Sequence, residues 1–194
     1  MPFVGLTGGL GAGKSTALAA LERLGAAGLS TDAVVHELYE DPEVRDAVSE
    51  RFGAGVLVDG NVDRGTLARV AFAEPGGREW LEQLLWPLVG ARVAEFRAAA
   101  QAATPAPVAV VIETPLLFEA GMEGLYDATI AVVAEDEVRG ARAAEREHEA
   151  LAEREARQLS QAEKARRATY VVHNQGTIEE LEKELSGVLA KLRR

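Results

Sequence analysis

A glycine-rich loop near the start of the chain constrains its fold more than any other feature. Residues Gly8–Ser15 read GGLGAGKS and match the pattern G-x-x-x-x-G-K-[ST]. Residues 3–6 before the loop are apolar and strand-prone, and residues 15–24 after it carry one apolar face at helical spacing. The glycines allow successive backbone N–H groups to converge on one small volume. A strand, such a loop and a helix together predict an α/β protein that binds a polyphosphate.

Each residue type in the loop suits the binding of a nucleoside triphosphate. The helix that begins near Gly13 adds the positive end of its dipole. Lys14 supplies a mobile positive charge for the β- and γ-phosphates, and the Ser15 hydroxyl can ligate Mg²⁺. A glycine-rich turn with an incidental lysine is the alternative, and it is weakened because lysine is rare in this chain. The predicted ATP-binding residues of this segment are Gly9, Leu10, Gly11, Ala12, Gly13, Lys14, Ser15 and Thr16.

The rest of the chain alternates strand and helix signals. Two continuous apolar runs, 108–112 and 128–134, have the pattern of parallel strands covered on both faces. A helix expected over 79–103 is interrupted near Pro87. This alternation predicts one domain with a mostly parallel sheet flanked by helices. The remaining expected segments are short strands at 26–30 and 171–172, helices over most of 33–104, and a closing helix at 178–192.

Composition and charge exclude several classes of function. The net charge of -10 argues against non-specific nucleic-acid binding, which needs clustered cations. The chain has no cysteine, so disulfides, thiolate zinc sites and cysteine nucleophiles are excluded. The apolar runs are short for a membrane span, and the start lacks the pattern of a signal peptide. We expect a soluble, cytoplasmic protein without a nucleic-acid or membrane partner, and the sequence predicts no oligomeric state.

The sequence also narrows the class of phosphate-loop protein. A switch GTPase requires the string N-K-x-D and a D-x-x-G after a strand, and neither string occurs. Kinases and ATPases remain. The length, the helical insertion after the second strand and an arginine-rich late segment favour a kinase of a small molecule. A regulator that binds ATP without transferring phosphate is the alternative from a different class.

Several segments outside the loop are similar to the dephospho-CoA kinase family, over about residues 3–190. The string PLLFE at 115–119 is the most distinctive, and Gln158 and Lys164 follow it at the spacing of that family's lid region. The chain departs from the family pattern at His36, Trp86, Arg139 and Thr169. The other matching segments are Leu6–Thr16, Asp32 with Val34 and Val35, Phe52-Gly53, Asp59-Gly60, Asp63-Arg64 with Leu67, Arg142, Arg146, Arg154, and Asn174 with Gly176.

The resemblance implies a P-loop NTPase kinase fold within a single domain, 1–194. Its core comprises 1–32, 105–135 and 159–194, with a helical acceptor subdomain at about 33–104 and a lid at about 136–158. The implied reaction is the ATP-dependent phosphorylation of the 3′-hydroxyl of dephospho-CoA, the last step of coenzyme A synthesis, with Mg²⁺. A kinase of another nucleotide or small metabolite on the same fold is the alternative, because a fold does not determine the acceptor.

Two candidate catalytic residues lie outside the loop. Asp32 follows the second expected strand, where its carboxylate could act as the general base or as the N-cap of a helix starting at Ala33. Arg139, Arg142 and Arg146 share a helix face, which is typical of a lid over ATP or of a solvated helix with ion pairs. The resemblance favours Asp32 as the base and Arg142 as the residue that stabilises the transferring phosphate.

Three further candidates surround the expected site. Glu113 follows the strand 108–112 and could hold Mg²⁺ through water, or serve as a cap or surface acid. Asn174, with Gly176, matches a late asparagine of the family and is expected to contact the ATP adenine, with a plain turn as the alternative. The segment 115–119 is expected to form a wall of the acceptor pocket, although its apolar side chains could equally be core.

Overall fold

The computed structural model describes residues 1–135 and 158–193. The chain divides into two compact units, one formed by Met1–Ser30 with Phe96–Arg194 and the other by Thr31–Glu95. The second unit ends at Glu95, whereas the helical segment was expected to extend to about residue 104. The end of the last helix of that segment belongs to the first unit. There, the Arg97 guanidinium lies 4.2 Å from the centre of the Phe3 ring.

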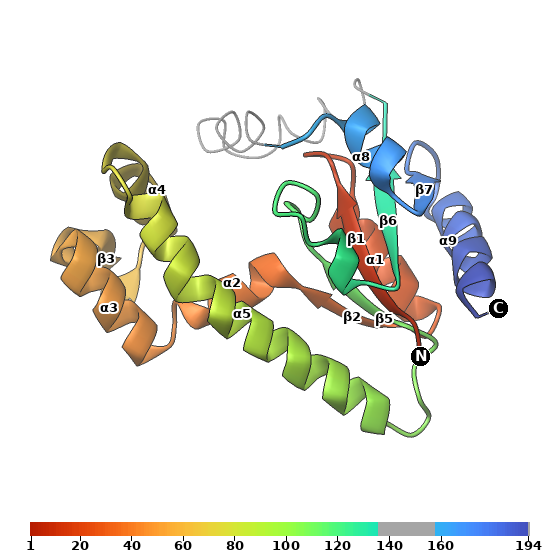
Figure 1. Cartoon of the computed structure of the whole chain (residues 1–194), viewed down its shortest axis with the longest axis horizontal. Helices are drawn as coiled ribbons and strands as arrows, with labels where there is room; N and C mark the ends of the chain where they lie inside the picture. Colours follow the sequence, from red (N-terminus) through yellow and green to blue (C-terminus); the bar gives the residue numbers. More distant parts are fainter. Residues whose placement is uncertain (136–157, 194) are drawn as a thin grey trace. The chain divides into compact units, whose positions relative to one another are not determined.

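The first unit is built on a five-stranded sheet (Figure 1). The strands lie in the order β2-β5-β1-β6-β7, and all neighbouring strands are parallel. The predicted parallel sheet is therefore confirmed. The bounds of the five strands are β1 Phe3–Gly8, β2 Ala27–Ser30, β5 Val110–Glu113, β6 Ala128–Val133 and β7 Tyr170–His173.

One face of this sheet is covered by two helices, α1 (Lys14–Arg23) and α9 (Ile178–Leu192). A capping box at Thr177 and Glu180 fixes the start of α9 at the predicted residue. Alternate residues of β1 point to this face, since Val4 and Leu6 lie in the apolar core. The helices contribute the following buried residues to that core: Ala17, Leu18, Ala20, Leu21, Leu181, Leu185, Val188 and Leu189.

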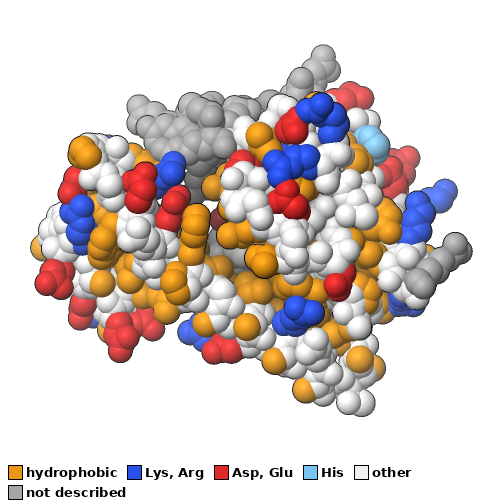
Figure 2. Space-filling model, viewed as in Figure 1, with side chains coloured by type: hydrophobic (Ala, Val, Ile, Leu, Met, Phe, Trp, Pro, Cys, Tyr) orange, Lys and Arg blue, Asp and Glu red, His pale blue; other side chains and the backbone are white. Residues whose placement is uncertain are grey.

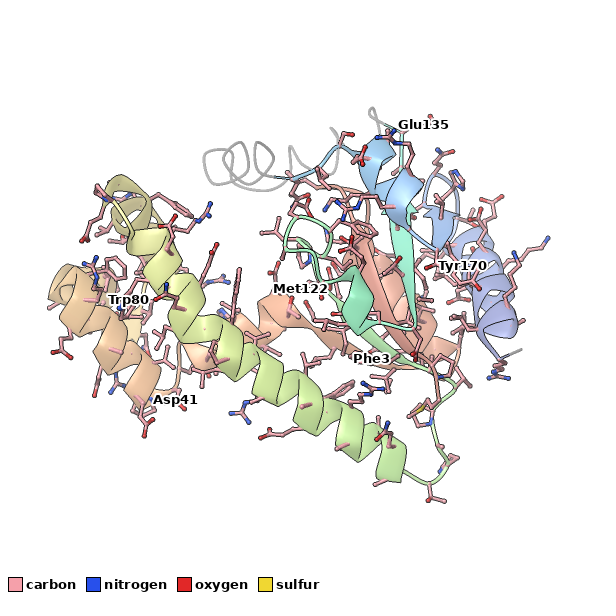
Figure 3. All side chains as sticks on the ribbon, viewed as in Figure 1. Phe3, Asp41, Trp80, Met122, Glu135 and Tyr170 are labelled. Atoms are coloured by element: carbon pink, nitrogen blue, oxygen red, sulfur yellow. The ribbon has the colours of Figure 1, made fainter. Side chains whose placement is uncertain are left out.

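The opposite face carries the segment that follows β5, a short 3-10 turn at Glu123–Leu125, and helix α8 (Gln161–Arg167). Gly5 explains how closely this segment approaches: a Cβ there would lie 2.4 Å from Leu117 Cδ1 and 2.8 Å from Tyr126 Cδ2. Tyr126 also stacks on Phe3, with ring centres 5.0 Å apart; Figure 3 labels Phe3 and Tyr170 on this sheet.

The second unit is mainly helical and has its own small core. Its N-caps come from Asp41, which accepts from Glu43 N, and Asp63, which accepts from Thr66 N. Phe52 packs edge-on against Trp80, labelled in Figure 3, with ring centres 5.5 Å apart. The elements, in order, are α2 Thr31–Leu38, α3 Pro42–Phe52, the 3-10 turn Ala54–Val56, β3 Leu57–Val58, β4 Asn61–Val62, α4 Arg64–Ala73 and α5 Gly77–Ala102, which continues into the first unit.

One local expectation for this region was wrong. Helix α5 is continuous through Pro87: a proline removes one backbone hydrogen bond, and the turns on both sides keep theirs. Between α3 and α4, the chain forms a short antiparallel hairpin of β3 and β4. Trp86, one of the departures from the family pattern, is 53% exposed.

Charges of both signs are interspersed on the face drawn in Figure 2. Across the described part of the chain, no helix combines the length and apolarity that a membrane span needs.

Candidate active site

The candidate site lies at the carboxyl end of β1, in the middle of the sheet. The next strand along the chain, β2, lies beyond β5 on one side of β1, whereas β6 lies on the other side. The order of the sheet therefore reverses at β1, and open α/β sheets bind ligands at such a point. The phosphate loop leaves β1 here, and Glu113 and Val133 end the two adjacent strands.

The conformation of the loop requires its glycines. Gly11 has φ 71° and Gly13 has φ 86°, in the left-handed region that other residues rarely adopt. A Cβ on Gly8 would lie 2.5 Å from the Val132 carbonyl oxygen, so the loop begins in close contact with the β6 backbone. Gly13 is also the N-cap of α1, which leaves the first N–H groups of that helix directed toward the loop.

The lysine and hydroxyl residues of the motif lie at the loop and on the first turn of α1. The Lys14 ammonium donates to the carbonyl oxygens of Gly8, at 3.3 Å, and Gly9, at 3.2 Å, so it lies across the loop. Ser15 and Thr16 are exposed on the first turn of α1. This segment thus combines a lysine, backbone donors and hydroxyls around one concave turn, which suits a polyphosphate.

Asn174 lies against the phosphate loop. It follows β7, is 5% exposed, and its side-chain amide donates to the Ala12 carbonyl oxygen at 2.9 Å. Its backbone N–H donates to the Val133 carbonyl oxygen at 2.8 Å. The residue therefore joins the ends of β6 and β7 to the loop, a role that the sequence did not predict.

The segment after β5 divides into core and surface. Glu113 is 7% exposed at the end of its strand, and Leu117 and Phe118 are buried in the core. Leu116 is 41% exposed, so among Leu116, Leu117 and Phe118 it alone offers substantial surface. Lys164 is completely buried beneath this segment, where its ammonium donates to the Pro115 carbonyl oxygen at 2.6 Å.

Of the two catalytic candidates outside the loop, Asp32 lies within the described residues and Arg142 does not. Asp32 is exposed in the first turn of α2, in the second unit. Helix α2 begins at Thr31, so Asp32 lies inside the helix. The expectation that Asp32 is the N-cap of a helix starting at Ala33 is therefore wrong. A carboxylate in a first turn is stabilised by the helix dipole. Arg142 and most of the proposed lid, 136–157, lie outside the described residues.

Hydrogen bonds that sequence reasoning missed connect other strand ends. The Gln161 side chain accepts from the Ala134 N–H and donates to the Ala134 carbonyl oxygen, both at 2.8 Å. Thr129 and Thr169 exchange backbone N–H to hydroxyl bonds of 3.0 Å in both directions. The Gln161 bonds join α8 to the end of β6. The Thr129–Thr169 bonds extend the β6–β7 pairing, and they give the departure from the family pattern at Thr169 a structural role.

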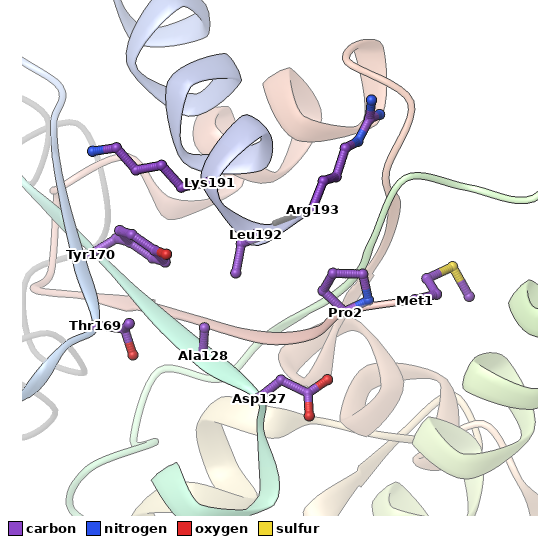
Figure 4. A pocket seen from close by; sticks show the side chains of 9 residues that line it. All are labelled: Met1, Pro2, Asp127, Ala128, Thr169, Tyr170, Lys191, Leu192 and Arg193. Carbon is purple, nitrogen blue, oxygen red and sulfur yellow. The ribbon is translucent and has the colours of Figure 1, made fainter.

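A separate hollow of about 670 Å³ lies at the amino ends of the strands (Figure 4). It is lined by the starts of β1, β6 and β7 and by the end of α9. The side chains of Lys191 and Arg193 diverge from the end of that helix in Figure 4. Because the phosphate loop is at the carboxyl ends of the strands, this hollow is distinct from the candidate site.

The phosphate loop on the central strand of a parallel sheet in the order β2-β5-β1-β6-β7 defines the chain as a P-loop kinase. The model of the family described as dephospho-CoA kinase matches residues 2–180. The chain therefore belongs to the dephospho-CoA kinase family.

Similar proteins support the same assignment. A protein of Deinococcus radiodurans named dephospho-CoA kinase is 41% identical over 97% of this chain and 91% of its own length. One of Moorella thermoacetica with the same name is 42% identical over 92% of this chain and 86% of its own length. A solved structure from Thermus thermophilus superposes with a TM-score of 0.81 at 35% identity, over 98% of both chains. A shikimate kinase of Bacteroides thetaiotaomicron, with a TM-score of 0.52 at 15% identity over 97% of this chain and 98% of its own, shares the fold alone.

Proposed function

We propose that the protein transfers the γ-phosphate of ATP to the 3′-hydroxyl of dephospho-CoA, giving coenzyme A and ADP. The observation that carries this proposal is the intact phosphate loop, with Lys14 across it, in a chain of the dephospho-CoA kinase family. A transfer of this kind needs little covalent chemistry from the protein, which contributes mainly positioning and charge stabilisation.

The loop residues hold the triphosphate. Backbone N–H groups from Gly9 to Thr16 and the start of α1 donate to its oxygens, and Lys14 neutralises charge on the β- and γ-phosphates. Binding exchanges the bonds that the ammonium makes to Gly8 and Gly9 for bonds to phosphate oxygens. ATP use follows from this chemistry and from the class of kinase.

Two oxygen-bearing side chains, those of Ser15 and Glu113, suit Mg²⁺. The hydroxyl of Ser15 is exposed beside the loop and the Glu113 carboxylate ends the adjacent strand, so both supply oxygen donors. The described residues contain no group of three or more His, Asp or Glu that could hold a metal. When bound, Mg²⁺ neutralises charge on the β- and γ-phosphate oxygens.

Asp32 is the proposed general base. Its carboxylate orients the acceptor 3′-hydroxyl and takes its proton as the oxygen attacks the γ-phosphorus and the bond to ADP breaks. Arg142 stabilises the charge on the transferring group from the lid at 136–158, which excludes water. The helical segment at about 33–104 contributes to acceptor binding. A cytoplasmic location stays a prediction.

An acceptor panel tests the proposal. Purified protein is given ATP and Mg²⁺ with dephospho-CoA, or with nucleoside monophosphates, shikimate or gluconate at matched concentration. We expect turnover with dephospho-CoA alone, and faster turnover of another acceptor would support a kinase of a different metabolite. The variant Asp32→Asn should keep the affinity for ATP and lose at least about a hundredfold in kcat, because the base is removed without changing the loop. Near-normal turnover of this variant would exclude the base role.

A further inference from the structure

A buried lysine lies behind the candidate site. Lys164 of α8 has no exposed surface, and its ammonium donates to the Pro115 carbonyl oxygen at 2.6 Å and contacts Glu119 Oε1 at 3.0 Å. Burial lowers the pKa of Lys164, and Glu119 opposes that shift. A buried charge is costly unless it is paired and hydrogen-bonded, so this geometry depends on both acceptors.

Both acceptors of Lys164 are shared with other parts of the first unit. Glu119 Oε1 also accepts from the Leu159 N–H at 2.7 Å. The Pro115 carbonyl oxygen also accepts from the Thr7 hydroxyl at 3.2 Å. One ammonium therefore holds both ends of the segment 115–119, and through Pro115 it is linked to β1.

The hydrogen bond between Thr7 and Pro115 connects this segment to the start of the phosphate loop. Thr7 is fully buried and directly precedes Gly8, where the loop begins. Pro115 follows Glu113 by two residues, and Glu113 pairs with Leu6 of β1 and Ser30 of β2. A shift of the Pro115 carbonyl would therefore move the exposed Leu116 and the Glu113 carboxylate relative to the loop.

We propose that Lys164 is a positioning residue for phosphoryl transfer, which keeps the segment 115–119 and the phosphate loop in one relative geometry. It acts through Pro115 and Glu119 and does not touch the reacting atoms. The inference rests on the proposed function for its kinetic readout. It goes beyond that function because it assigns a role to a residue outside the loop and outside the catalytic candidates.

Stability alone cannot distinguish positioning from simple packing. Removing one partner of a buried ion pair leaves an uncompensated charge, whereas neutralising both partners is often tolerated. The design therefore compares Lys164→Met with the double variant Lys164→Met/Glu119→Gln. Lys183→Met serves as the control, because Lys183 is exposed on α9.

We expect Lys164→Met to lower kcat with dephospho-CoA by about tenfold or more, because small misplacements in a transfer site are costly. The affinity for ATP should change little, since the loop residues are intact. The double variant should regain thermal stability and keep the low kcat. Lys164→Arg, which keeps the charge, should recover part of the kcat.

The proposal is overturned if folded Lys164→Met has the kcat of Lys183→Met, or if the double variant regains kcat together with stability. If Lys164→Met does not fold, the double variant and Glu119→Gln provide the same comparison. Amide hydrogen exchange at 8–13 and 115–119 supplies a readout that needs no acceptor. Exchange should be faster in both segments of Lys164→Met than in the wild type. Inactive wild-type protein would refute the proposed function, whereas unchanged exchange would refute the role of Lys164.

Discussion

Replacing Asn174 by aspartate tests how the phosphate loop is held. The side-chain amide donates to the Ala12 carbonyl oxygen at 2.9 Å, and both residues are buried. Aspartate has nearly the same shape and puts an acceptor oxygen where the donor was. The variant therefore loses one buried hydrogen bond and places two oxygens against each other, without a large change in packing.

The expected loss follows from the environment of this bond. A buried carbonyl left without its partner costs about 1–3 kcal/mol. If most of that cost falls on the binding-competent loop, the affinity for ATP drops by roughly 5- to 150-fold. The matched control is Gln175→Glu, because Gln175 is exposed, adjacent and undergoes the same amide-to-acid change.

Titration calorimetry with two ligands, ATP and inorganic triphosphate, distinguishes the possible roles of Asn174. If the residue positions the loop, both ligands weaken by the same factor in Asn174→Asp. If it contacts the adenine, as the sequence predicts, ATP weakens more than triphosphate does. Equal triphosphate affinity in Asn174→Asp and Gln175→Glu would refute the positioning argument.

Two further substitutions test the packing around the site. Gly8→Ala places a methyl group 2.5 Å from the Val132 carbonyl oxygen, so we expect a loss of about 1–3 kcal/mol in the free energy of unfolding and weaker ATP binding. Gly187→Ala, with open space around its Cβ, should show neither effect. Burial raises the pKa of Tyr126, so its contribution to stability is complete below about pH 10 and is lost as pH rises through the folded pKa. Urea unfolding near pH 8 and near pH 10.5 should show a smaller alkaline loss for Tyr126→Phe than for the wild type, and parallel losses would contradict this.

The local elements of the fold were largely predictable because they depend on short-range signals. The apolar run 128–134 became β6, and the closing helix spans Ile178–Leu192 as expected. The run 108–112 began later than predicted, at Val110. Hydrophobicity marks a buried strand, but pairing with β1 and β2 determines where its regular part begins.

The phosphate loop was predictable for the same reason, since its chemistry lies within Gly8–Thr16. The contacts that support it join distant parts of the chain, such as Asn174 to Ala12 and Lys164 to Pro115. No short-range pattern shows that a lysine in a polar helix is buried, or which carbonyl an asparagine reaches. Identifying those partners required the three-dimensional structure.

The most direct test of the account is the product of a single reaction. Purified protein is incubated with ATP, Mg²⁺ and 3′-dephospho-CoA, and ADP and the acceptor are followed by mass and by phosphorus NMR. We expect one ADP for each acceptor that gains one phosphate, with that phosphate on the 3′-oxygen. Bound ATP without any phosphorylated dephospho-CoA, or phosphate on a different oxygen, would contradict it.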